Sequence, residues 1–127
     1  IAKARGESVV LVTPASFIPD NYSEASFLNR TLDYSEHTLP VELWGSVSGV
    51  LAAMAIHREI IRDVAKEAIK QGDQVRLVDF ASQVTTGRDN FHDVCHLTDR
   101  ASQILAELIV DTAIEAGAKA HGPYALK

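Results

Sequence analysis

The residues that could do chemistry are concentrated in one short segment, residues 90–98. This segment holds a carboxylate, a thiol and two imidazoles, from Asp93, Cys95, His92 and His96. A carboxylate that accepts a hydrogen bond from histidine Nδ1–H fixes the ring tautomer and leaves Nε2 free to take a proton from a nucleophile. Asp93 and His96 are separated by two residues, which allows this contact in a tight turn. The same spacing also occurs by chance, with the histidine at a helix entry and the aspartate capping a loop.

Two other kinds of site could use the same side chains. Histidine, carboxylate and thiolate groups all bind zinc. Close neighbours in one turn rarely point at one ion, however, so we predict no metal site and no cofactor. A Cys95 nucleophile with His96 as its base is disfavoured, because adjacent side chains diverge. We expect Cys95 to be a small buried hydrophobic residue.

Two short apolar segments and a helix between them must position these residues. Residues 8–13 are a β-branched apolar run, typical of a parallel strand buried on both faces, and residues 75–80 are predicted to form a second short strand. Residues 52–71 carry apolar side chains at intervals of three and four, which predicts a helix that Gly72 ends, with His57 on its apolar face. The order strand, helix, strand predicts a parallel βαβ unit and an α/β fold.

The segment that holds Asp93 and His96 leads directly into the last predicted helix. Thr98 is the predicted N-cap, and Asp99 follows it where negative charge suits the helix dipole. Gly117 is expected to end the helix, and residues 118–127 are expected to form a tail.

Residues 14–46, between the first strand and its helix, form a much longer insertion loop than most strand–helix connections. This segment leaves the carboxyl end of a parallel strand, where α/β proteins bind ligands. It contains aromatic residues, of which Trp44, Tyr22 and Phe17 are our candidates for a substrate-binding wall or lid. Alternatively, the segment forms a short helix and its aromatic side chains pack against the domain. His37 is expected to be exposed.

The charge and hydropathy of the chain argue against two classes of partner, nucleic acids and membranes. The chain of 127 residues has 12 Lys and Arg against 17 Asp and Glu, a net charge of −5, without a basic cluster. There is thus no electrostatic reason to bind nucleic acid or an anionic membrane surface. The longest nearly apolar stretch, residues 47–56, is far shorter than the roughly 20 residues of a membrane-spanning helix. The single cysteine excludes a disulfide within the chain.

Residues 93–98, with the sequence Asp-Val-Cys-His-Leu-Thr, resemble the last conserved block of the SGNH (GDSL-like) hydrolases. In that family the Asp and His of an Asp-x-x-His turn belong to the catalytic triad, so the resemblance implies catalytic roles for Asp93 and His96. Residues 9–14 resemble the family's late strand with its Thr-Pro exit, and residues 75–80 resemble its final strand. The resemblance spans most of the chain and implies a three-layer α/β/α, flavodoxin-like parallel sheet.

The sequence departs from the family in one respect. The Gly-Asp-Ser-type block with the nucleophilic serine, and the two blocks with the oxyanion donors, are not in it. We therefore expect residues 1–127 to be the C-terminal portion of one domain, whose N-terminal half lies on the same or a separate chain. Residues 1–7 are expected to end the helix that leads into the first strand.

The resemblance implies a serine-dependent ester hydrolase that acts on a small-molecule or carbohydrate acyl ester, carbohydrate O-acetyl esters among them. This chain by itself is expected to be inactive. The alternative is a non-catalytic, truncated or degenerate SGNH-like module that binds a partner through its open sheet edge and the aromatic residues of the loop 14–46.

Overall fold

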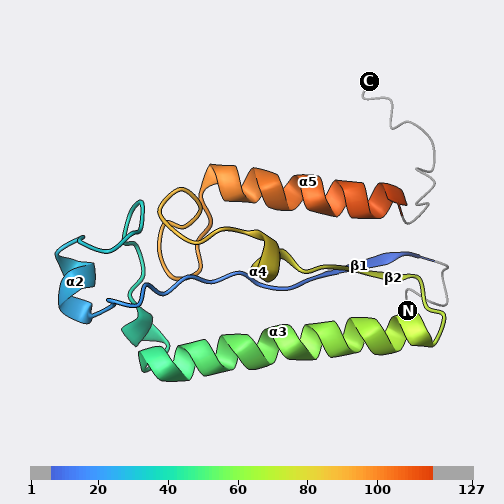
Figure 1. Ribbon diagram of the computed structural model, residues 1–127, viewed down its shortest axis with the longest axis horizontal. Coiled ribbons are helices and arrows are strands. Elements are labelled where there is room, and N and C mark those ends of the chain that lie inside the picture. Colours follow the sequence, from blue (N-terminus) through green and yellow to red (C-terminus); the bar gives the residue numbers. More distant parts are fainter. Residues whose placement is uncertain (1–6, 116–127) are drawn as a thin grey trace.

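Two short parallel strands lie at the centre of the structure, a computed structural model that describes residues 7–115 (Figure 1). Strand β1 (Val9–Val12) pairs with β2 (Val75–Val78), with Val9 opposite Val75 and Val12 opposite Val78. The predicted parallel pairing and the mixed α/β class are confirmed. The residues of β1 are half-buried rather than buried on both faces, because β2 is the only strand that pairs with β1 among the described residues.

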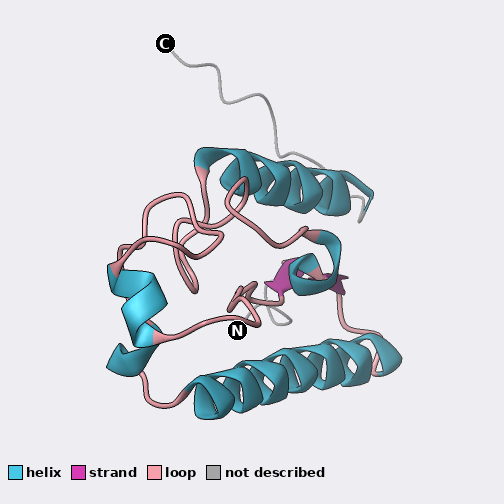
Figure 2. Ribbon diagram, turned by 60° about the vertical axis from the view of Figure 1, so that its left-hand side comes forward, coloured by secondary structure: helices cyan, strands magenta, loops and turns pink. Residues whose placement is uncertain are grey.

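Two long helices lie on opposite sides of the strand pair (Figures 1 and 2). Helix α3 (Val47–Lys70) begins earlier than predicted, because Ser46 caps it and its Oγ accepts the Gly49 N–H at 3.1 Å. Helix α5 (Asp99–Glu115) begins as predicted, after Thr98, whose Oγ1 accepts the Ala101 N–H at 3.3 Å. No helix among residues 7–115 is long and apolar enough to cross a membrane.

The predictions for both ends of the chain lie outside the described residues. They concern the helix end at Gly117, the tail at 118–127 and all but the last residue of the segment 1–7.

Strand β2 is shorter than predicted, because the chain turns at Asp79 and Phe80 begins the short helix α4 (Phe80–Gln83). Thr13, at the end of β1, holds this turn. Its Oγ1 donates to Asp79 Oδ1 at 2.7 Å and accepts the Ala81 N–H at 3.1 Å. The two strand ends are therefore linked by side-chain hydrogen bonds where the backbone pairing stops.

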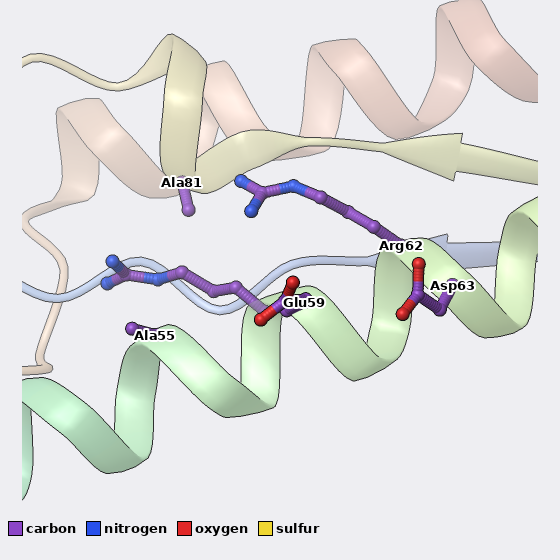
Figure 3. A pocket seen from close by; sticks show the side chains of 6 residues that line it. Ala55, Glu59, Arg62, Asp63 and Ala81 are labelled. Atoms are coloured by element: carbon purple, nitrogen blue, oxygen red, sulfur yellow. The ribbon is translucent and has the colours of Figure 1, made fainter.

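Arginines on α3 tie this helix to the strand ends. Arg62 binds the Asp79 carboxylate with two hydrogen bonds of 2.9 and 3.0 Å, and this contact lowers the pKa of Asp79 below its ordinary value. Arg58 donates to the Pro14 carbonyl at 2.9 Å and to Ser16 Oγ. Both arginines line an open cavity of about 490 Å³, in which Arg62 extends from α3 toward α4 (Figure 3). Because both arginines are hydrogen-bonded to residues at or just after the strand ends, this cavity lies where α3 is joined to the strands.

The segment 14–46 builds a second core at the end of the molecule. It contains helix α2 (Glu24–Leu28) and the 3-10 helix η1 (Val41–Leu43). Phe91, which lies outside this segment and precedes α5, completes its cluster of buried side chains. The members are Phe27, Leu32, Tyr34 and Phe91. Part of the segment is thus a short helix with packed aromatic residues, as one of the two predictions had it.

Candidate functional site

The turn that carries Asp93 and His96 is closed at its base by backbone hydrogen bonds. Phe91 and Leu97 form an isolated antiparallel bridge, and the His92 N–H donates to the His96 carbonyl at 2.8 Å. The Phe91 side chain is fully buried in the aromatic core. Burial of Phe91 therefore anchors the turn to the segment 14–46.

The Asp93 carboxylate is buried and accepts hydrogen bonds from three backbone N–H groups. Oδ1 accepts from Cys95 at 3.0 Å and from His96 at 2.9 Å, and Oδ2 accepts from Leu39 at 3.0 Å. Burial by itself raises the pKa of Asp93. The hydrogen bonds from His96, Cys95 and Leu39 outweigh it and hold the pKa below its ordinary value. Asp93 is therefore a carboxylate at neutral pH.

The same carboxylate faces the imidazole of His96. His96 Nδ1 lies 2.9 Å from Oδ1 and 2.8 Å from Oδ2 of Asp93. The His96 side chain is 51% exposed, whereas that of Asp93 is fully buried. With its proton on Nδ1, the ring is oriented by a buried anion and keeps Nε2 as the nitrogen that can accept a proton. The contact predicted from the Asp-x-x-His spacing is present; its use in catalysis stays a prediction.

His96 borders an open cavity of about 470 Å³ with His92 and Ser102. His92 has other partners, because its Nδ1 lies 2.6 Å from Ser35 Oγ and 3.4 Å from Glu36 Oε1. Within residues 7–115, no serine hydroxyl makes a hydrogen bond with His96. The described part of the chain thus holds an oriented imidazole at the edge of an open cavity.

The structure corrects two expectations about Cys95. Its side chain is exposed rather than buried, and its Sγ lies 3.9 Å from His96 Nδ1 instead of diverging from the ring. Desolvation and the charge of Asp93 raise the pKa of this thiol. A raised pKa favours the protonated thiol, which is the weakly nucleophilic form. The surroundings of Cys95 therefore do not favour its thiolate form.

Asp93, Cys95 and His96 each place one potential metal ligand within 4.8 Å of the others. We expected the side chains of neighbours in one turn not to converge, and three of them do. The Asp93 oxygens already accept three backbone N–H groups, and the His96 Nδ1 faces the same carboxylate. Coordination through Nδ1 would require that contact to be given up, since a metal-bound nitrogen carries no proton.

The three predicted substrate-binding residues lie in different places. Tyr22 and Phe17 pack against the aromatic core. Burial helps to raise the pKa of Tyr22 to about 12, and its phenol hydroxyl donates to Glu42 at 2.7 Å. Trp44 is half exposed and borders a cavity next to Cys95. The structure therefore brings Trp44, but not the other two, to a cavity that adjoins the His96 turn.

Two other histidines differ from their predicted environments. His57 on α3 is exposed rather than on a packed face. His37 is half-buried rather than exposed, because its ring packs against Phe27 and Tyr34. Burial lowers the pKa of His37.

Leu39 is the site residue that the sequence did not reveal. Its contribution is a backbone N–H, which every residue except proline has, so its side-chain type carries no signal. The one available signal was indirect: the long segment 14–46 had to pack somewhere near the strand ends.

We compared the chain with models of protein families, with curated proteins and with solved structures, and found no match.

Proposed function

We propose that this chain supplies the histidine and aspartate of a Ser-His-Asp triad in an ester hydrolase. The observation that carries the proposal is the buried, ionised Asp93 that holds Nδ1 of the half-exposed His96. The serine and the oxyanion donors come from the N-terminal half of the domain, on the same or a separate chain. The Asp-x-x-His resemblance to the SGNH hydrolases supports the same assignment.

Each residue has a defined part in the reaction. The serine oxygen attacks the ester carbonyl while His96 Nε2 accepts the hydroxyl proton. The imidazolium then gives this proton to the departing alkoxide, which leaves an acyl-serine. Water attacks the acyl-serine through the same base, and the carboxylic acid is released. Asp93 stays ionised throughout, keeps the ring oriented and stabilises the imidazolium.

The architecture is compatible with a domain whose N-terminal half supplies the serine and whose C-terminal half supplies Asp93 and His96. Helices α3 and α5 lie on opposite sides of β1 and β2, so further strands that paired with β1 would extend the sheet into a three-layer α/β/α, flavodoxin-like fold. A small-molecule or carbohydrate acyl ester fits the site, since the exposed face of Trp44 is a surface on which a sugar ring can pack.

The test is substitution of His96 in the complete protein. We expect His96→Ala to lower kcat/KM for p-nitrophenyl butyrate by about 10⁴-fold or more, because removal of a triad member has effects of this size. The circular dichroism spectrum should be unchanged, since the ring is half exposed. A fluorophosphonate probe should label one serine in the unsubstituted protein.

His92→Ala is the matched control, because His92 borders the same cavity but contacts Ser35 and Glu36. It should retain most of the activity. Full activity of His96→Ala would rule out the triad assignment.

A non-catalytic binding module is the second candidate. It is supported by large apolar side chains that α3 leaves exposed, Ile56, Ile60 and Val64 among them. Exposed apolar surface of this kind marks interaction sites. If no serine of the complete protein reacts with a fluorophosphonate and no ester is hydrolysed, this candidate replaces the enzyme.

A further inference from the structure

A small apolar cavity lies between the first turns of α3 and the turn that carries His96. Its volume is about 280 Å³, and α3 lines it with small and apolar side chains. The residues that matter for the argument are Gly49, Val50, Ala53 and Met54 on α3, with Trp44 and Cys95 beside them. A charged side chain is not among the described residues that line it. Its polar lining residue Ser16 already accepts a hydrogen bond from Arg58.

This cavity adjoins the proposed catalytic base. Cys95 lines both this cavity and the open cavity that His96 borders. The Cys95 Sγ lies 3.9 Å from His96 Nδ1. A molecule that fills the apolar cavity therefore contacts Cys95, which separates this cavity from the one that His96 borders.

The size and lining of the cavity define what it can hold. Gly49 and Ala53 are one helical turn apart, so their lack of bulk leaves a groove along α3. Val50 and Met54 present apolar atoms on the same stretch of helix. The volume of about 280 Å³ lies just below the roughly 300–1,000 Å³ of small-molecule sites, which suits a short alkyl chain and excludes a full lipid tail.

We propose that this cavity binds the alkyl part of the acyl group, so that the substrates are esters of short aliphatic acids longer than acetate. The inference rests on the proposed function, in which His96 acts at the ester carbonyl. Each methylene that enters the cavity should then strengthen binding about fourfold until the cavity is full.

The test uses Cys95, the single cysteine of this sequence, as a reporter of occupancy. The probes are methyl ketones with propyl, pentyl, heptyl and undecyl chains, which are neutral and resemble esters. In the complete protein, the rate of Cys95 alkylation by N-ethylmaleimide is read by peptide mass spectrometry. We expect the ketone concentration that protects Cys95 to fall about fourfold for each methylene added to the propyl chain. The gain should stop at a chain shorter than undecyl, when the cavity is full.

Ala53→Phe fills the cavity from an exposed helix position, and it should abolish protection by the ketones. The matched control is Ala52→Phe, the same change at the neighbouring exposed position outside the cavity lining, which should leave protection intact. Met54→Ala enlarges the cavity. In this variant, protection should continue to improve up to a longer alkyl chain than in the unsubstituted protein.

Protection that is absent, independent of chain length or unchanged in Ala53→Phe would overturn the proposal. Its failure is distinguishable from failure of the proposed function. If His96→Ala is inactive but the ketones give no protection, the triad stands and the acyl site falls. If His96→Ala is fully active and the protection pattern holds, the cavity binds alkyl chains but does not serve this base.

Discussion

Asp93 combines a structural and a chemical role in one side chain. It accepts three backbone N–H groups from two segments of the chain and also orients His96. An amide at this position has one oxygen instead of two, and its NH₂ group would face an N–H donor.

We therefore expect Asp93→Asn to lower the free energy of unfolding by about 1–3 kcal/mol at pH 7, the cost of leaving buried donors without an acceptor. Urea denaturation of the 127-residue chain measures this. His92→Asn, in the same turn at a less buried position, is the control and should have a smaller effect. Equal losses would show that the carboxylate does not hold the turn.

The contribution of Asp93 should also depend on pH. Its pKa is depressed in the folded protein, whereas the unfolded chain has a value of about 3.9. The folded state thus binds fewer protons in this range. The stabilisation is fully present above about pH 4 and is lost as the pH falls through the folded value. The stability difference between the unsubstituted protein and Asp93→Asn should shrink below about pH 4, as measured by denaturation at several pH values. A difference that grows on acidification would contradict the assignment.

At the scale of elements, the site depends on a turn packed against a long insertion. Gly87 opens the short turn that precedes it, and its carbonyl accepts the N–H groups of Asn90 and Phe91. Its φ is +117°, a conformation that L-residues rarely adopt, and an added Cβ would lie 2.8 Å from Asp33 Oδ2. The path of the chain into the Asp93 turn therefore relies on a glycine.

Gly87→Ala should lower the free energy of unfolding by about 1–3 kcal/mol, chiefly because it forces a residue with a Cβ into a φ of +117°; the Asp33 carboxylate is at the end of an exposed side chain and can move away. Gly72→Ala is the matched control. Gly72 also has a positive φ, +78°, but its Cβ would meet no atom within 4 Å. Thermal unfolding followed by circular dichroism should show a larger loss for Gly87→Ala. Equal losses in the two variants would contradict the greater strain assigned to the φ of +117° at Gly87.

At the scale of the whole molecule, α3 has apolar side chains on more of its surface than the two strands can cover. Ile56, Ile60 and Val64 follow one another at intervals of four residues, and each is more than half exposed. Such a row is the surface that a helix normally packs against a neighbour. In the proposed complete domain, the N-terminal half covers it.

The 127-residue chain should accordingly bind the dye ANS, and Ile60→Lys should reduce this binding without lowering the free energy of unfolding, since Ile60 is exposed. Gln103→Lys adds the same charge at an exposed position of α5 and should leave the dye signal unchanged. Co-expression with the N-terminal half should suppress the signal of the unsubstituted chain. If Ile60→Lys leaves the ANS fluorescence unchanged, the dye binds to a surface other than this row on α3.

The sequence by itself determined the local features. The β-branched runs at 9–12 and 75–78, their parallel order and the Thr98 cap are read from neighbouring residues, because propensity, periodicity and capping act over a few positions. The contact of Asp93 with His96 is local for the same reason.

Tertiary structure decided what surrounds that contact. The Leu39 N–H on the carboxylate, the packing of Phe17 and Tyr22 into a core, and the exposure of Cys95 all depend on how residues 14–46 fold back over the turn. Such contacts join positions more than fifty residues apart, as between Leu39 and Asp93. These contacts are stabilised by burial of apolar surface and by hydrogen bonds to backbone donors. Neither effect requires particular residue types at a fixed spacing, so neither can be recognised in the sequence.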